Sequence, residues 1–156
     1  MKKDLYKEQA SYLIKAIDIA IDSFKKFPPK DFLPEHVIKI INTYLDFRHE
    51  VLNPEEKFRT ITSLKYSIND VFIFFQETGG VTVNFFWQEV NKMVLPYKRE
   101  NKLQKILKRG KIKTQIEYDF IIDVLVPYQQ EGLINNEDSL KIKILLTEFE
   151  KLAPKS

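Results

Sequence analysis

Apolar residues along much of the chain recur at three- and four-residue intervals, the spacing that places them on one face of an α-helix. The first such run consists of Leu13, Ile14, Ile17, Ile21 and Phe24. The opposite face carries charged residues, namely Lys15, Asp18, Asp22, Lys25 and Lys26. This pattern predicts a first helix that ends at the prolines 28–29 and a second that begins near Pro34.

The same reading predicts the remaining elements. Asn53-Pro54 resembles a helix N-terminus, so we expect a third helix from there to the glycine pair 79–80. A fourth covers about 82–95, and a capping box at Thr114 begins another that ends or kinks at Pro127. Two passages alternate like strands, 81–83 and 140–144, but helical spacing is stronger in both. The prediction is an all-α fold of six or seven helices, a single compact bundle over residues 1–156.

The composition is compatible with this fold and indicates the cellular compartment to expect. A chain of 156 residues with 44% hydrophobic residues can build one real core. It has no cysteine, which excludes disulfides and thiolate chemistry and fits a reducing cytoplasm. Acidic and basic residues interrupt every apolar run near the N-terminus, and no run is long enough to span a membrane. We therefore expect a soluble cytoplasmic protein.

Residues for catalysis are scarce. The two histidines, His36 and His49, lie thirteen residues apart on one predicted helix and point to nearly opposite faces. Asp46, His49 and Glu50 have ligand-like spacing, but a solvated polar face explains them better, because metal centres usually draw ligands from several elements. No glycine-rich phosphate loop or nucleophile elbow is present. We predict no cofactor, no metal site and no enzymatic activity.

Charge is concentrated in one segment. Residues 98–113 hold eight Lys or Arg and one Glu, a balance of +7 in a chain of net charge +3, so the other residues sum to −4. Helical spacing would place Lys98, Lys102, Lys105 and Arg109 on one stripe, continued by Lys111 and Lys113. An apolar seam would lie on the other side. The expectation is a basic amphipathic helix.

Three interpretations of this segment compete. In the first, the lysines are a solvated face that balances acidic neighbours. In the second, they contact nucleic-acid phosphates, although few arginines are present to read bases. In the third, they dock on a protein with an acidic surface or on an anionic membrane, and the narrow seam without Trp or Phe argues against the membrane.

Aromatic residues exceed what a single helix face accommodates. Val71 to Phe75 is an unbroken apolar run, which leaves Phe74 away from the main stripe, and Phe85 lies off the seam of the next helix. One explanation is a central helix packed on several sides. The other is an exposed aromatic patch for a partner.

These features lead to a hypothesis. The chain is a non-enzymatic protein–protein interaction module, antitoxin-, immunity- or adaptor-like, that binds an acidic protein or associates with itself. The alternative is a nucleic-acid-binding accessory protein acting through segment 98–113. A third hypothesis, an enzyme or metal-binding protein, would require a pocket where Asp46, His49 and acids from another helix converge. The predicted partner-binding residues are Lys98, Lys102, Lys105, Arg109, Lys111, Lys113, Phe74 and Phe85.

Overall fold

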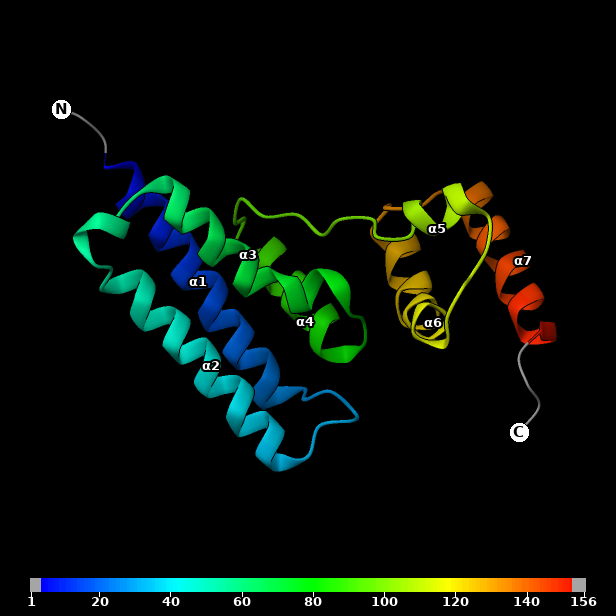
Figure 1. The fold of residues 1–156 in the computed structure, drawn as a ribbon, viewed down its shortest axis with the longest axis horizontal. Helices are drawn as coiled ribbons and strands as arrows, with labels where there is room; N and C mark the ends of the chain where they lie inside the picture. Colours follow the sequence, from blue (N-terminus) through cyan, green and yellow to red (C-terminus); the bar gives the residue numbers. More distant parts are fainter. Residues whose placement is uncertain (1–3, 153–156) are drawn as a thin grey trace. The chain divides into compact units, whose positions relative to one another are not determined.

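The computed structural model describes residues 4–152, and all regular structure within them is helical (Figure 1). The predicted all-α fold is confirmed, with seven α-helices and one short 3-10 helix in this range. The elements are α1 (Leu5–Lys26), α2 (Pro34–Leu52), the 3-10 helix η1 (Glu56–Phe58), α3 (Ile61–Glu77), α4 (Val81–Lys92), α5 (Gln104–Arg109), α6 (Gln115–Gln130) and α7 (Asn136–Leu152).

The chain packs as two compact units, each with its own apolar core. Unit 1 consists of residues 1–75 and 81–98, and unit 2 of residues 76–80 and 99–156. Every buried apolar residue of the described chain belongs to one of two clusters, and each cluster lies within one unit. The expectation of one domain over residues 1–156 stays a prediction.

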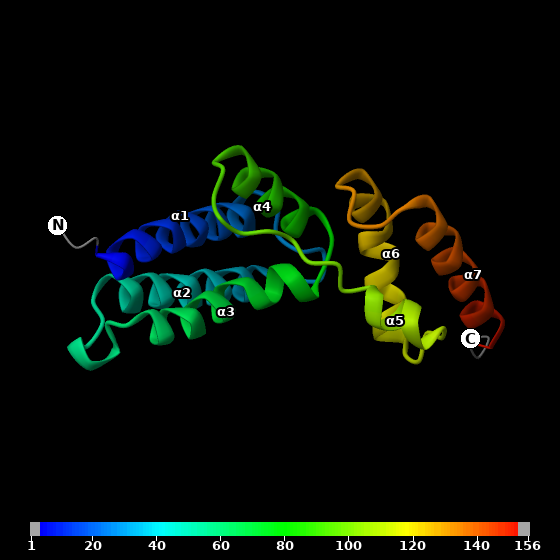
Figure 2. The same ribbon diagram turned by 90° about the horizontal axis from the view of Figure 1, so that it is seen from above.

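Unit 1 is built on an antiparallel hairpin of α1 and α2, completed by α3 and α4 (Figures 1 and 2). Its core is strongly aromatic: the rings of Phe75 and Phe86 stack at 3.8 Å between centroids. Two buried side chains of this core donate hydrogen bonds to backbone carbonyls. The Tyr44 hydroxyl donates to the carbonyl of Val71 at 2.6 Å, and the Trp87 indole N–H donates to that of Phe75 at 2.9 Å.

The third helix begins later than expected. Asn53 ends α2 instead of starting α3, because its backbone N–H donates to the carbonyl of His49 at 2.9 Å. The chain then forms η1 before α3 begins at Ile61. Thr60 caps that start, since its hydroxyl accepts from the N–H of Ser63 at 3.1 Å. Pro54 lies near a helix boundary, as predicted, but it follows the end of α2 and does not begin α3.

Helix α4 ends in an unusual backbone conformation. The N–H of Val94 donates to the carbonyl of Asn91 at 3.1 Å, and that of Leu95 donates to Val90 at 3.2 Å, which together form a Schellman motif. The motif requires a left-handed residue, and Val94 occupies that position with φ 53°. A β-branched side chain is strained there. Pro96 follows, as expected for a chain that leaves a helix.

Unit 2 is centred on the hairpin of α6 and α7 (Figure 2), with α5 packed on α7 (Figure 1). Pro127 lies inside α6, and the helix continues past it to Gln130 before Gly132 turns the chain in the left-handed region. Residues 76–80, the C-terminal end of α3 and the connection to α4, also belong to this unit. A Cβ on Gly79 would lie 2.8 Å from Asp123 Cβ, so only glycine permits this approach to α6.

Candidate partner-binding site

The basic segment is helical over only part of its length, which corrects the predicted amphipathic helix. Within residues 98–113, only α5 (Gln104–Arg109) is helical. Asn101 holds the preceding stretch in another path: its carbonyl oxygen accepts from the N–H of Leu103 at 2.9 Å, and its amide donates to the carbonyl of Leu133 at 3.1 Å. Lys98 and Lys102 therefore do not continue a helical stripe with Lys105 and Arg109.

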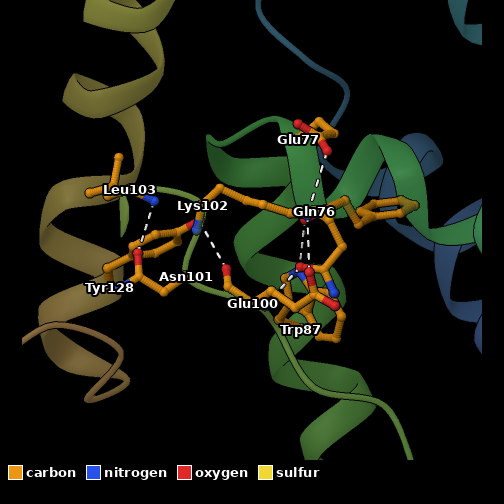
Figure 3. A network of polar contacts seen from close by, with 9 residues as sticks. Gln76, Glu77, Trp87, Glu100, Asn101, Lys102, Leu103 and Tyr128 are labelled. Atoms are coloured by element: carbon orange, nitrogen blue, oxygen red, sulfur yellow. Dashed lines mark hydrogen bonds and ion pairs between the residues drawn. The ribbon is translucent and has the colours of Figure 1, made fainter. Parts of the chain in front are cut away.

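Lys102 is neutralised inside unit 2. Its ammonium lies 3.0 Å from the carboxylate of Glu100 and 3.6 Å from that of Glu77 (Figure 3). Its backbone N–H approaches the Tyr128 hydroxyl at 3.4 Å. The hydrogen bond to Glu100 raises the pKa of Lys102. These ion pairs match the first interpretation of the segment, in which the lysines balance the charge of acidic neighbours.

Both arginines of the segment are also paired with carboxylates. Arg99 is buried, with its guanidinium 5.0 Å from the centre of the Tyr128 ring and 3.1 Å from the Glu131 carboxylate. Arg109 donates to Glu117 at 2.6 Å and to the carbonyl of Lys111 at 2.9 Å. A buried guanidinium over an aromatic face is part of the fold, so Arg99 is not available to a ligand.

Four lysines remain at the surface without such partners. Within residues 4–152, none of their ammonium groups takes part in an ion pair, and all four side chains are exposed. Of the two other lysines of the segment, Lys98 is also exposed and Lys102 is half-buried. The four lie within nine residues, on α5 and on the loop that joins it to α6. We call them the lysine cluster: Lys105, Lys108, Lys111 and Lys113.

The two aromatic candidates are half-buried in unit 1. Phe74 contacts the rings of Phe24 and Phe75, each at 5.2 Å between centroids. Phe85 packs on the Phe27 ring at 4.9 Å. Both rings and Lys98 belong to unit 1, whereas Lys102, Arg109 and the lysine cluster belong to unit 2. The packing of the two rings matches the interpretation of a helix covered on several sides.

Sequence reasoning missed two exposed apolar faces. On α2, Ile38, Leu45 and Leu52 are exposed at seven-residue spacing. On α7, Leu140 and Ile144 are exposed one turn apart. The period of a helix shows which residues share a face, but it does not tell which of two apolar faces the core covers.

Unit 1 also contains a cavity of about 600 Å³ that no sequence motif had indicated. Its walls come from α1, the C-terminal end of α2, η1 and α3, so residues from four separate elements converge. Tyr6 and Leu64 are buried at its floor, while Phe58 and Tyr66 are exposed at its edge. A cavity of this size with an apolar floor and a few polar groups has the form of a small-molecule site.

Among the described residues, no three His, Cys, Asp or Glu side chains come together as a metal site. Asp46, His49 and Glu50 all lie on α2.

No protein-family model, curated protein or solved structure matches this chain. Of the helices in residues 4–152, none combines the length and apolarity needed to cross a membrane.

Proposed function

We propose that this protein is a non-enzymatic binding module that docks on an acidic surface of a partner protein through the lysine cluster. The observation that supports it is the division of charge within segment 98–113. Lys102, Arg99 and Arg109 have carboxylate partners in the same unit, whereas the cluster has none among the described residues. Four unneutralised ammonium groups on a short stretch attract an acidic surface and steer its approach.

The local backbone favours this role. Gly110 ends α5 with φ 72°, and Arg109 fastens the following loop through its bond to the carbonyl of Lys111. Glu117 fixes the far end of the loop by accepting from the N–H of Lys113 at 2.8 Å. The lysine side chains thus extend from a backbone that is already held in place, which lowers the entropic cost of binding.

Nucleic acid is the second candidate, since phosphates would also satisfy the lysines. The arginines argue against it. Arg99 and Arg109, the two arginines of segment 98–113, are held with little exposure in ion pairs with Glu131 and Glu117. Neither guanidinium is left to read base edges beside the cluster, so lysine contacts alone would bind without sequence preference.

Charge reversal tests the proposal. A Lys105→Glu, Lys108→Glu, Lys111→Glu, Lys113→Glu variant removes the lysine cluster. The matched control reverses four exposed lysines outside the segment, at Lys15, Lys39, Lys65 and Lys143, with the same change in net charge. Fluorescence anisotropy measures binding of a labelled glutamate-rich peptide and of a short DNA duplex, each at about 50 and 200 mM salt.

We expect the wild type and the control to bind the peptide, and the cluster variant to bind it at least about tenfold more weakly, a loss of roughly 1.4 kcal/mol. Binding should weaken as salt rises. Equal peptide binding by the two reversed variants would refute the proposal. Tighter binding of the duplex than of the peptide, lost in the cluster variant, would replace it with the nucleic-acid candidate.

A further inference from the structure

The cavity of unit 1 has a lining that favours a positively charged occupant. Glu50 and Glu55 supply two carboxylates, and no lysine or arginine lines the walls. Within residues 4–152 the Glu50 carboxylate has no ion-pair or hydrogen-bond partner. Glu55 is paired with the ammonium of Lys57 at 3.5 Å, but both side chains are about 70% exposed. A surface pair of this kind contributes little and is readily displaced.

Three aromatic rings of the lining add the second component of a cation site. The rings of Tyr6, Phe58 and Tyr66 contribute to the walls, and Tyr66 is 72% exposed. The Tyr6 hydroxyl donates to the carbonyl of Val51 at 2.9 Å, which fixes the ring at the floor. The face of an aromatic ring is electronegative and attracts ammonium and guanidinium groups.

Two of these rings already hold cations of the protein itself. The Arg59 guanidinium lies 4.9 Å from the centre of the Tyr6 ring, and the Lys57 ammonium lies 4.9 Å from that of Phe58. Arg59 is fixed by a 2.6 Å bond to Asp4, outside the lining. Neither cation belongs to the lining, and each lies over one face of its ring, so Tyr6 and Phe58 already make cation–π contacts of the kind proposed for a ligand.

We propose that this cavity binds an organic cation, an alkylammonium or guanidinium group, between the aromatic rings and the carboxylates of Glu50 and Glu55. The two carboxylates supply the charge, and the rings supply a surface that accepts the alkyl part of the ligand. The hydroxyl groups of Ser63 and Ser67 in the lining offer further acceptors. The site lies in unit 1 and does not depend on the lysine cluster of unit 2.

A pair of isosteric probes isolates the charge. Choline and 3,3-dimethyl-1-butanol have the same shape, and only choline is cationic. Each is titrated into the ¹⁵N-labelled full chain, and shifts of the amide signals of the lining residues report binding. We expect choline to bind at least about tenfold more tightly than the alcohol, as cation–π and carboxylate contacts together would give. Equal binding of both probes would mean a merely apolar cavity and overturn the proposal, as would no shift with choline.

Variants locate the site. Glu50→Gln and Tyr66→Leu each change an accessible lining residue, and each should weaken choline binding several-fold. Glu35→Gln is the matched control, because Glu35 is exposed on the same helix α2 but lies outside the lining. Unchanged choline binding in both lining variants would refute the assignment, provided that their spectra retain the wild-type dispersion.

The cation has two sources, a free amine or a lysine side chain of another protein. A short blocked peptide with one central lysine distinguishes them. If it binds more tightly than choline, the site recognises a partner's side chain. If choline binds more tightly, the ligand is a free small amine. Either result requires the lining residues to shift, and shifts confined to other residues would contradict the proposal.

Discussion

At the scale of the single residue, Val94 is a β-branched residue in a backbone conformation that disfavours it. Its φ of 53° lies in the left-handed region, and its side chain is 85% exposed. Exposure means that almost no packing compensates the strain of a β-branched residue there. The equivalent position at the end of α6 is Gly132, where the same Schellman bonds form without strain.

Replacing Val94 with asparagine should therefore stabilise the protein. Asn tolerates the left-handed region, so Val94→Asn is expected to raise the free energy of unfolding by about 0.5–1 kcal/mol in urea denaturation. Gly132→Ala is the reciprocal test. A Cβ there meets no atom within 4 Å, so only the backbone term changes and we expect a loss of about 1 kcal/mol. A neutral or destabilising Val94→Asn would contradict the strain argument.

Residue-level reading also explains what the sequence could reveal about the candidate site. It identified Lys105, Lys111 and Lys113 by type and density, and these side chains are exposed. It could not foresee that Lys102 is paired with Glu77, twenty-five positions earlier in the chain. Ion pairs between distant segments follow from tertiary packing and leave no local pattern. The cavity escaped detection for the same reason, since its lining comes from four elements.

At the scale of the element, helix boundaries depend on how neighbouring signals compete. The glycine pair 79–80 follows the end of α3, as predicted. Gly80 has φ 103°, a left-handed backbone conformation in which a residue with a side chain would be strained. Asn53 was misread because asparagine caps either end of a helix. The segment around Lys98 is not helical, because contacts with residues far along the chain hold it in another path. The Asn101 side chain donates to the carbonyl of Leu133, and Arg99 packs over the Tyr128 ring.

The junction of α5 and α6 depends on one carboxylate. Glu117 accepts from Arg109 at 2.6 Å and from the N–H of Lys113 at 2.8 Å, while its own N–H donates to the Thr114 hydroxyl. Thr114 thus caps α6 as the predicted capping box requires, while the Glu117 carboxylate bonds to Arg109 and to the N–H of Lys113. The Arg109 hydrogen bond lowers the pKa of Glu117, with the amide of Lys113 contributing in the same direction.

This gives a pH-dependent prediction. Because the pKa of Glu117 is lower in the folded than in the unfolded state, the stabilisation is complete above the unfolded value and is lost as the pH falls through the folded one. Glu117→Gln should cost about 1–2 kcal/mol at pH 7, and the difference from wild type should shrink at about pH 3.5.

Urea denaturation followed by far-UV circular dichroism at both pH values measures this effect. Glu148→Gln serves as the control, because Glu148 is exposed on α7 and lies in no ion pair among the described residues. It should change stability by less than about 0.5 kcal/mol. A cost for Glu117→Gln that stays the same at both pH values would contradict the assigned role.

At the scale of the whole molecule, the sequence predicted the all-α class correctly because helical periodicity runs through nearly every segment. It could not reveal that the buried residues form two clusters. Periodicity assigns a residue to the buried face of its helix, but it does not show which other helices pack against that face. Trp87 and Ile142 are both fully buried, yet they belong to different cores.

Two separate cores predict two unfolding transitions that respond to different substitutions. Trp87 is the only tryptophan and reports on unit 1 alone, whereas far-UV circular dichroism reports on all helices. Ile142→Ala removes fully buried volume from unit 2 and should destabilise that unit by about 2–5 kcal/mol. We expect the circular dichroism curve to gain an early phase while the Trp87 fluorescence midpoint stays at its wild-type value.

Val90→Ala is the complementary change, because Val90 is fully buried in the core of unit 1. It should lower the fluorescence midpoint and leave the unit 2 phase in place. Coincident shifts of both probes in both variants would instead show a single cooperative domain, since two-state unfolding requires every probe to follow one transition. That outcome would favour the one-domain expectation and make the two clusters parts of one folding unit.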